Sequence, residues 1–187
     1  MNQEVVFFLE ERSAEALLST VVPRLLPDSA PFRCIVFEGK QDLDRSLVRR
    51  MKRYLNSGAR FVVLRDQDLG NCKEIKEALR GKCGEAGRPE AVVRIICREL
   101  ESWYLVDLPA VERGLERRGF SQLQRKRIYR SPDTIPAPSK ELARLVPSYQ
   151  KISGSRLIGP HLDLCNERSA SFACFVKTLR DMAKSLP

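Results

Sequence analysis

The sequence lacks the features that direct a chain into or across a membrane. Its 187 residues contain no apolar run approaching the roughly 20 residues that a membrane-spanning helix needs. A secretory signal peptide begins with a basic stretch, and the N-terminal segment MNQEVVFFLEERS has none ahead of its short apolar run. We therefore expect a cytoplasmic protein with no membrane partner.

Common zinc-binding and nucleotide-binding motifs are also missing. The six cysteines form no Cys-x-x-Cys pair, so we expect no zinc site and interpret them as reduced thiols. The glycine-bearing segment GKCGEAG lacks the serine or threonine and the preceding strand of a phosphate-binding loop. This excludes nucleotide binding of that kind there.

Positive charge is what the chain has in excess. The formal net charge is +9, which favours a polyanionic partner, nucleic acid first. The length and a hydrophobic content of 43% suit one domain with its own core. We expect residues 1–187 to form a single domain, with an α/β core at 1–107 and a helical and loop extension at 108–187.

Strand and helix patterns alternate through the first hundred residues. We predict helices at 13–27, 42–58 and 72–87, the first capped by Ser13 and the second ended by Gly58. Apolar runs predict four strands, at 4–10, 32–39, 59–66 and 90–100. The runs are nearly continuous, as expected when helices cover both faces of a mostly parallel, doubly wound sheet. A ligand site is then expected at the carboxyl ends of the strands.

Two aspartates follow the third strand in the segment FVVLRDQDLG. Asp66 and Asp68 are two residues apart, so in a strand they point to the same side, about 6.6 Å from each other. If they turn toward one point, two unit charges about 4 Å apart repel by on the order of 4 kcal/mol at an effective dielectric of 20. A hard divalent cation such as Mg²⁺ offsets such repulsion, because it prefers oxygen ligands.

Acidic residues end two more of the predicted strands. Glu10 and Glu11 end the first strand, and Glu99 and Glu101 lie at the end of the fourth, on a shared face if that strand continues through them. Three strands therefore deliver acids to one edge of the sheet, which predicts a metal site there. Glu101 is a candidate for a second metal position; its alternative is an acid facing a helix N-terminus. An acidic metal site on a basic protein suits cleavage of a phosphate backbone.

Several other side chains are candidates for binding or proton transfer. Lys40 follows the second strand and either contacts a phosphate at the same edge or is a solvated loop lysine. His161, the single histidine, and Asp163 are candidates for proton transfer or phosphate binding; the alternative is a structural hydrogen bond in a loop.

A basic run, residues 116–130, interleaves positive and aromatic side chains. Phe120 and Tyr129 lie within it, so the run suits contact with a nucleic-acid backbone and stacking on bases; the alternative is a solvated helix face. The basic candidates in the run are Arg117, Arg118, Arg125, Lys126, Arg127 and Arg130.

The acidic pattern resembles the TOPRIM superfamily, which includes topoisomerases, bacterial primases and the overcoming-lysogenization-defect nucleases. The resemblance rests on FFLEERSAE, with a glutamate ending strand one, and on VVLRDQD, with Asp-x-Asp ending a later strand. More closely, the chain resembles small stand-alone TOPRIM-like bacterial proteins of a domain-of-unknown-function family, which are often thought to accompany ATPases in defence loci. FEGKQDL, CRELESWYL, SPDTIPAPSKEL and HLDLCNERSASFACF extend this resemblance over most of the chain.

The resemblance implies roles for the acids. Glu10 would act as general acid/base, and Asp66 and Asp68 would hold Mg²⁺ or Mn²⁺. The superfamily often has glycine where this chain has Glu11, and the motif spacing favours Glu10 over Glu11. The implied function is a Mg²⁺-dependent TOPRIM-like nuclease of DNA or RNA, acting as the effector of a defence system with an ATPase partner.

Two other functions fit parts of the pattern. The first is a non-catalytic metal- or nucleic-acid-binding regulatory subunit, because one superfamily includes members of very different activity. The second is phosphoryl transfer of the haloacid dehalogenase type, which also uses Asp-x-Asp. That motif normally ends the first strand, where this chain has a glutamate, so we disfavour it.

The basic run predicts salt-dependent binding of nucleic acid. Neutralising Arg125, Lys126 and Arg127 together should flatten the log–log salt dependence of affinity by up to roughly three units, about 0.9 for each lost phosphate contact. Titrations of DNA and RNA at several salt concentrations measure the slope. An unchanged slope would show that the run is ordinary solvated surface.

Overall fold

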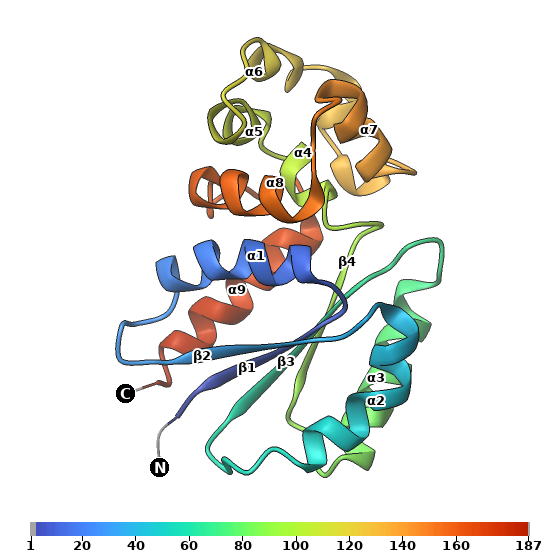
Figure 1. The fold of residues 1–187 in the computed structure, drawn as a ribbon, viewed down its shortest axis with the longest axis vertical. Helices are drawn as coiled ribbons and strands as arrows, with labels where there is room; N and C mark the ends of the chain where they lie inside the picture. The colour runs from blue at the N-terminus through green and yellow to red at the C-terminus, as the bar shows by residue number, and fades with distance from the viewer. Residues whose placement is uncertain (1–2, 187) are drawn as a thin grey trace.

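Residues 3–186 of the computed structural model are described below, and their centre is a four-stranded parallel sheet. The strands are β1 (Val5–Leu9), β2 (Phe32–Val36), β3 (Arg60–Asp66) and β4 (Val92–Ile96). Their order is β2-β1-β3-β4, and each neighbouring pair is parallel. The predicted parallel α/β sheet is therefore confirmed (Figure 1).

Helices cover both faces of the sheet because its central strand is apolar on both sides. Val5, Phe7 and Leu9 join one buried cluster, while Val6 and Phe8 join another. The first cluster includes α1 (Arg12–Val21) and α9 (Ala170–Ala183); the second includes α2 (Lys40–Lys52) and α3 (Cys72–Glu85). The two helix layers are visible on either side of the sheet (Figure 1).

Residues 102–161 form a stack of short helices above the sheet, called the extension below (Figure 1). It contains α4 (Ser102–Leu105), α5 (Leu108–Gly114), α6 (Phe120–Leu123), α7 (Pro138–Leu145) and α8 (Lys151–Ile158). Its single 3₁₀ turns are η2 (Arg127–Tyr129), η3 (Pro132–Thr134) and η4 (Gly159–His161), and a further turn, η1 (Val22–Arg24), follows α1. Trp103 of α4 packs against Phe172 and Phe175 of α9, so the extension shares the core of the sheet.

Helices α1 and α8 lie side by side and join the extension to the sheet (Figure 1). Gly159, just after α8, lets the two segments approach closely, because a Cβ at this position would lie 2.0 Å from Thr20 Oγ1 and 3.1 Å from Leu17 Cδ1 of α1. Only a residue without a side chain fits this contact.

Three local predictions were wrong. The fourth strand ends at Ile96 and not at residue 100, because Arg98 has a φ of +60° and turns the chain. The second helix ends at Lys52, well before Gly58. The residue that precedes α1 as its N-cap is Glu11, and the Ser13 hydroxyl donates to the Glu11 carboxylate instead of capping the helix. Within residues 3–186, no helix is long and apolar enough to cross a membrane.

The α1–α8 contact predicts that Gly159 cannot be replaced by a larger residue without loss of stability. Gly159→Ala should lower the free energy of unfolding by about 1–3 kcal/mol, the usual cost of overpacking. Gly84→Ala in α3 is the matched control, because a Cβ there meets no atom within 4 Å. It should be neutral or stabilise the protein by up to about 1 kcal/mol. Urea unfolding of both variants measures the difference; equal stabilities would contradict this account of the contact.

Candidate metal and nucleic-acid site at the carboxyl edge of the sheet

Strand register brings the predicted acids to one edge of the sheet. Leu9 of β1 pairs with Leu64 of β3, so Glu10 lies beside the last residues of β3. Asp66 is the final residue of β3, and it pairs with the final residue of β4, Ile96. Because these strands are parallel, their carboxyl ends meet at this edge.

Asp66 is the buried centre of the group. Its exposed fraction is 9%, and its Oδ2 accepts a hydrogen bond of 3.2 Å from the backbone N–H of Leu100. Burial raises the pKa of Asp66 well above its usual range, and the carboxylates of Glu10, Glu11 and Glu101 raise it further. The structure therefore places four acids close enough to repel one another.

Glu10, a member of this group, also lies beside a half-buried arginine, Arg65. Burial raises the pKa of Glu10, as does the charge of Asp68, while the Arg65 guanidinium opposes the shift. Arg65 Nε is 3.9 Å from Glu10 Oε2, and Arg65 Nη1 donates to both carboxylate oxygens of Asp44 at 3.0 Å. Among the residues described, Glu10 Oε2 has no hydrogen-bond partner.

Asp68 lies on a turn after β3 and contacts Lys40. Its φ is +53°, and its backbone N–H donates to the carbonyl of Arg98 at 2.7 Å. Lys40 Nζ is 2.7 Å from Asp68 Oδ2, and this hydrogen bond raises the pKa of Lys40. The sequence placed Lys40 in a loop, whereas it is the first residue of α2 and points to the acidic edge.

Glu101 is fully buried beside the same edge, immediately before α4. Burial raises its pKa, and the Lys151 ammonium partly opposes this. The Tyr149 hydroxyl donates to Glu101 Oε1 at 3.2 Å, while Oε2 has no hydrogen-bond partner among the described residues. Gly154 accommodates the tyrosine, since a Cβ there would lie 2.2 Å from Tyr149 Cε2.

The sequence analysis did not identify Tyr149 and Lys151. Lys151 Nζ is 3.4 Å from Glu11 Oε2, so Glu11 faces α8. Burial lowers the pKa of Lys151, but neighbouring carboxylates, Glu101 first, outweigh this and leave it raised. Nothing in the local pattern PSYQKIS distinguishes these residues from an ordinary helix start; only the packing of α8 on α1 brings them to the acids.

The candidate ligands are chemically suited to a hard divalent cation, but their side chains do not surround one point. Every candidate ligand is a carboxylate, and Glu10 and Glu101 each have a buried oxygen that lacks a hydrogen bond. Across residues 3–186, however, no three acidic, histidine or cysteine side chains converge closely enough to hold a metal ion. Mg²⁺ commonly takes only one or two carboxylates and completes its shell with water and phosphate, so the residues present fit it.

Three further candidates lie away from this group or have structural partners. His161 is in η4, beyond the far end of α8, an eight-residue helix about 12 Å long. Asp163 Oδ1 accepts from the backbone N–H of Cys165, which is the structural alternative. Glu99 does not share a strand face with Glu101; its Oε2 accepts from the backbone N–H of Ser139 at the start of α7.

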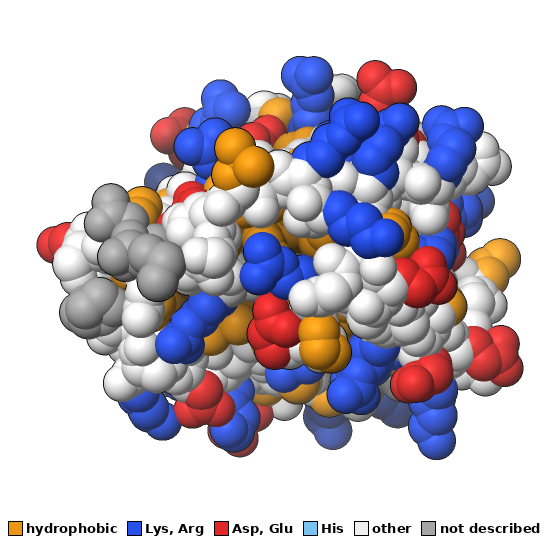
Figure 2. Space-filling model, turned by 90° about the horizontal axis from the view of Figure 1, so that it is seen from below, with side chains coloured by type: hydrophobic (Ala, Val, Ile, Leu, Met, Phe, Trp, Pro, Cys, Tyr) orange, Lys and Arg blue, Asp and Glu red, His pale blue; other side chains and the backbone are white. Residues whose placement is uncertain are grey.

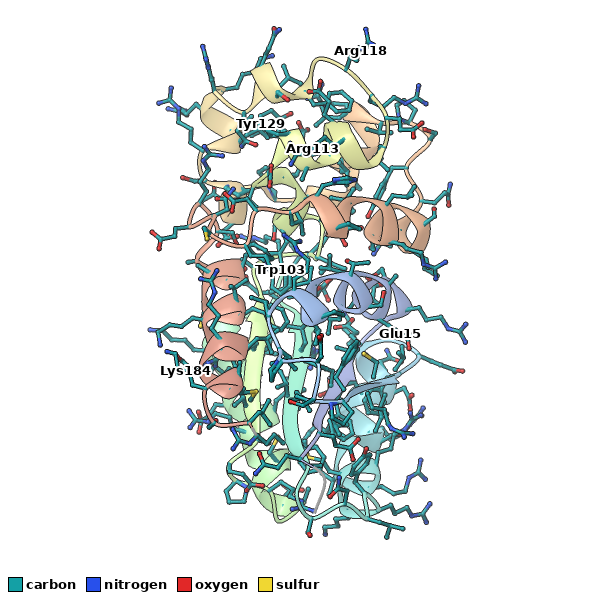
Figure 3. The ribbon with its side chains drawn as sticks, turned by 90° about the vertical axis from the view of Figure 1, so that its left-hand side faces the viewer. Glu15, Trp103, Arg113, Arg118, Tyr129 and Lys184 are labelled. Atoms are coloured by element: carbon teal, nitrogen blue, oxygen red, sulfur yellow. The ribbon has the colours of Figure 1, made fainter. Side chains whose placement is uncertain are left out.

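The two aromatic residues of the basic run differ in exposure. Tyr129 is only 1% exposed and its hydroxyl donates to Glu141, whereas Phe120 is half-buried and packs against the core. The stacking interpretation is therefore wrong for Tyr129. The six predicted basic side chains are all exposed, and Arg118 lies at the end of the molecule distant from the sheet (Figure 3). Lysine and arginine side chains are also spread among acids over the opposite end (Figure 2).

Comparison with protein families identifies the chain. Residues 9–180 match the family described as Domain of unknown function (DUF4276). The chain belongs to this family. A search of the curated proteins finds no match.

The fold is similar to that of one solved structure, the C-terminal region of the Burkholderia pseudomallei OLD protein. The TM-score is 0.55 at 12% sequence identity, and the match covers 96% of this chain and 98% of that one. At this identity the likeness establishes a shared fold. Together with the all-parallel sheet, it confirms the predicted α/β fold, in which helices cover both faces of a four-stranded parallel sheet.

The buried charge of Asp66 predicts a stabilising substitution. A pKa raised in the folded state means that folding favours the protonated form, so stability is lost as pH rises through that pKa. With a chelator present, Asp66→Asn should raise the free energy of unfolding at pH 8 by on the order of 1–3 kcal/mol, and by less at pH 4. Denaturant unfolding at both values tests this beside Glu77→Gln, an exposed control on α3. A gain that does not depend on pH would contradict it.

Proposed function

We propose that the protein is a Mg²⁺- or Mn²⁺-dependent nuclease that hydrolyses phosphodiester bonds in DNA or RNA. The observation that supports this most is the buried Asp66 carboxylate, whose pKa is raised by burial and by Glu10, Glu11 and Glu101. A bound cation would relieve this repulsion, and catalytic sites are where such perturbed acids concentrate.

Each acid has a role that its surroundings suit. Asp66 and Asp68 would hold the ion, with Glu101 at a second position. When bound, the ion supplies charge stabilisation for the phosphate and acidifies water. Burial raises the pKa of Glu10, and its Oε2 has no hydrogen-bond partner among the described residues, so Glu10 is suited to accept a proton and return it. Lys40 and the exposed basic side chains of the extension would contact the phosphate backbone.

The likeness to the OLD protein supports this function through the fold, and the resemblance to the TOPRIM superfamily supports it through the positions of Glu10, Asp66 and Asp68. The same resemblance suggests that the protein works in a defence system with an ATPase partner. Activity would then depend on that partner.

A second function is supported by a specific observation. Asp68 and Glu11 already pair with Lys40 and Lys151, and no three acids in the described part of the chain converge on one point. This arrangement also suits a non-catalytic subunit that binds metal or nucleic acid and regulates a partner.

Substitution of the acids separates catalysis from metal binding. Glu10→Gln should abolish nicking of plasmid, linear duplex, single-stranded DNA and RNA while it preserves the rise in melting temperature that Mg²⁺ or Mn²⁺ produces. Asp66→Asn with Asp68→Asn should abolish both. Assays are run with and without the partner ATPase, beside Glu77→Gln.

Activity that resists chelation, or full activity of Glu10→Gln, would contradict the nuclease mechanism. Metal binding without cleavage, even with the partner present, would favour the regulatory subunit. An equal metal-induced shift in the double variant would exclude Asp66 and Asp68 as ligands.

A further inference from the structure

A cleft of about 530 Å³ lies beside the acidic group. Asp68 and Lys40 line one part of it, and Leu69, Ile75 and Pro136 line another. Pro136 comes from the extension, so the cleft lies between the turn after β3 and the segment that leads into α7. Its volume falls within the range of roughly 300–1,000 Å³ that small-molecule sites occupy.

Arg65 and Glu99 also line the charged part of the cleft, but Arg65 already contacts Asp44 and Glu99 accepts from the Ser139 N–H. Lys40 is therefore the group there that suits a phosphate. Lys40 donates to Asp68 at 2.7 Å, and its side chain is 50% exposed. An ammonium group has three N–H donors, so contact with Asp68 leaves others for a second acceptor. Lys40 also begins α2, whose dipole adds partial positive charge at this end of the helix.

The apolar part of the cleft is held in place and faces solvent. Leu69 is 87% exposed, yet its turn is well bonded: the Gln67 side-chain amide donates to the Gly70 carbonyl at 3.0 Å, and the Asp68 N–H donates to Arg98 at 2.7 Å. Gly70 packs closely on Ile75, because a Cβ there would lie 2.7 Å from Ile75 Cδ1. An exposed leucine on a well-bonded turn, together with Ile75 and Pro136 in the same cleft, offers apolar contact.

We propose that this cleft binds one nucleotide of a single-stranded nucleic acid, next to the phosphodiester at the acidic group. The phosphate contacts Lys40, and one face of the base lies on Leu69, Ile75 and Pro136. A paired base in a duplex is stacked on both faces, whereas an unpaired base has a free face. This inference rests on the proposed function and adds its substrate class: single strands or unpaired ends.

Matched variants test the cleft by binding alone, with a chelator present so that no cleavage is needed. Leu69→Ala and Lys40→Ala alter the cleft. Leu55→Ala and Lys52→Ala are the controls: Leu55 is 97% exposed in the connection from α2 to β3, and Lys52 is an exposed lysine at the other end of α2. Fluorescence anisotropy follows labelled single-stranded DNA, single-stranded RNA and the corresponding duplex across a salt series.

Leu69→Ala should weaken single-strand affinity by roughly three- to tenfold, as expected for losing about half of the burial of one leucine side chain. Lys40→Ala should reduce the salt slope by about 0.7, the value for one phosphate contact on a single strand. Both controls should bind like the unsubstituted protein. Duplex binding should be weaker and insensitive to Leu69→Ala, and a 5′-mononucleotide should compete better than inorganic phosphate.

Other outcomes would overturn the inference in distinguishable ways. Single-strand binding that none of the four variants changes would exclude the cleft and leave the proposed nuclease standing. If only Lys40→Ala lowers single-strand affinity, and inorganic phosphate competes as well as the mononucleotide, the cleft binds an anion and not a nucleotide. If the protein neither binds nor cleaves any nucleic acid, both the cleft and the proposed nuclease function are contradicted.

Discussion

Carboxylates gather at the carboxyl edge of the sheet, and the fold has to offset their mutual repulsion. Asp66 and Glu101 are buried there, where the low dielectric strengthens repulsion and removes hydration. The fold offsets this with three cations from three elements: Lys40 from α2, Arg65 from β3 and Lys151 from α8. A metal ion entering this group would compete with these ion pairs.

The extension is part of this balance. Tyr149 and Lys151 reach the acids because α8 packs along α1, and Gly159 permits that packing. Trp103 anchors the other side of the extension through the aromatic rings of α9. The positions of Glu11 and Glu101 are therefore set as much by the extension as by the sheet.

The sheet and the placement of its acids were predictable from the sequence, because both follow from local pattern. Apolar runs mark the strands, and an acid that ends a parallel strand must lie at the carboxyl edge, as Glu10 and Asp66 do. The left-handed turn at Arg98 was not predictable, because a non-glycine residue gives no sign of a positive φ. The prediction that Tyr129 stacks on bases was wrong for a different reason: its charged neighbours in the sequence are exposed, while its own ring is buried.

The ion pair between Glu11 and Lys151 joins segments that are synthesised at different times. Its partners are 140 residues apart in the sequence, so the contact closes a long loop. Contacts of such separation form slowly, and during synthesis the acids of the first strands leave the ribosome long before α8 exists. The complete charge balance, and any activity that depends on it, is therefore acquired only after α8 has been synthesised and has packed on α1.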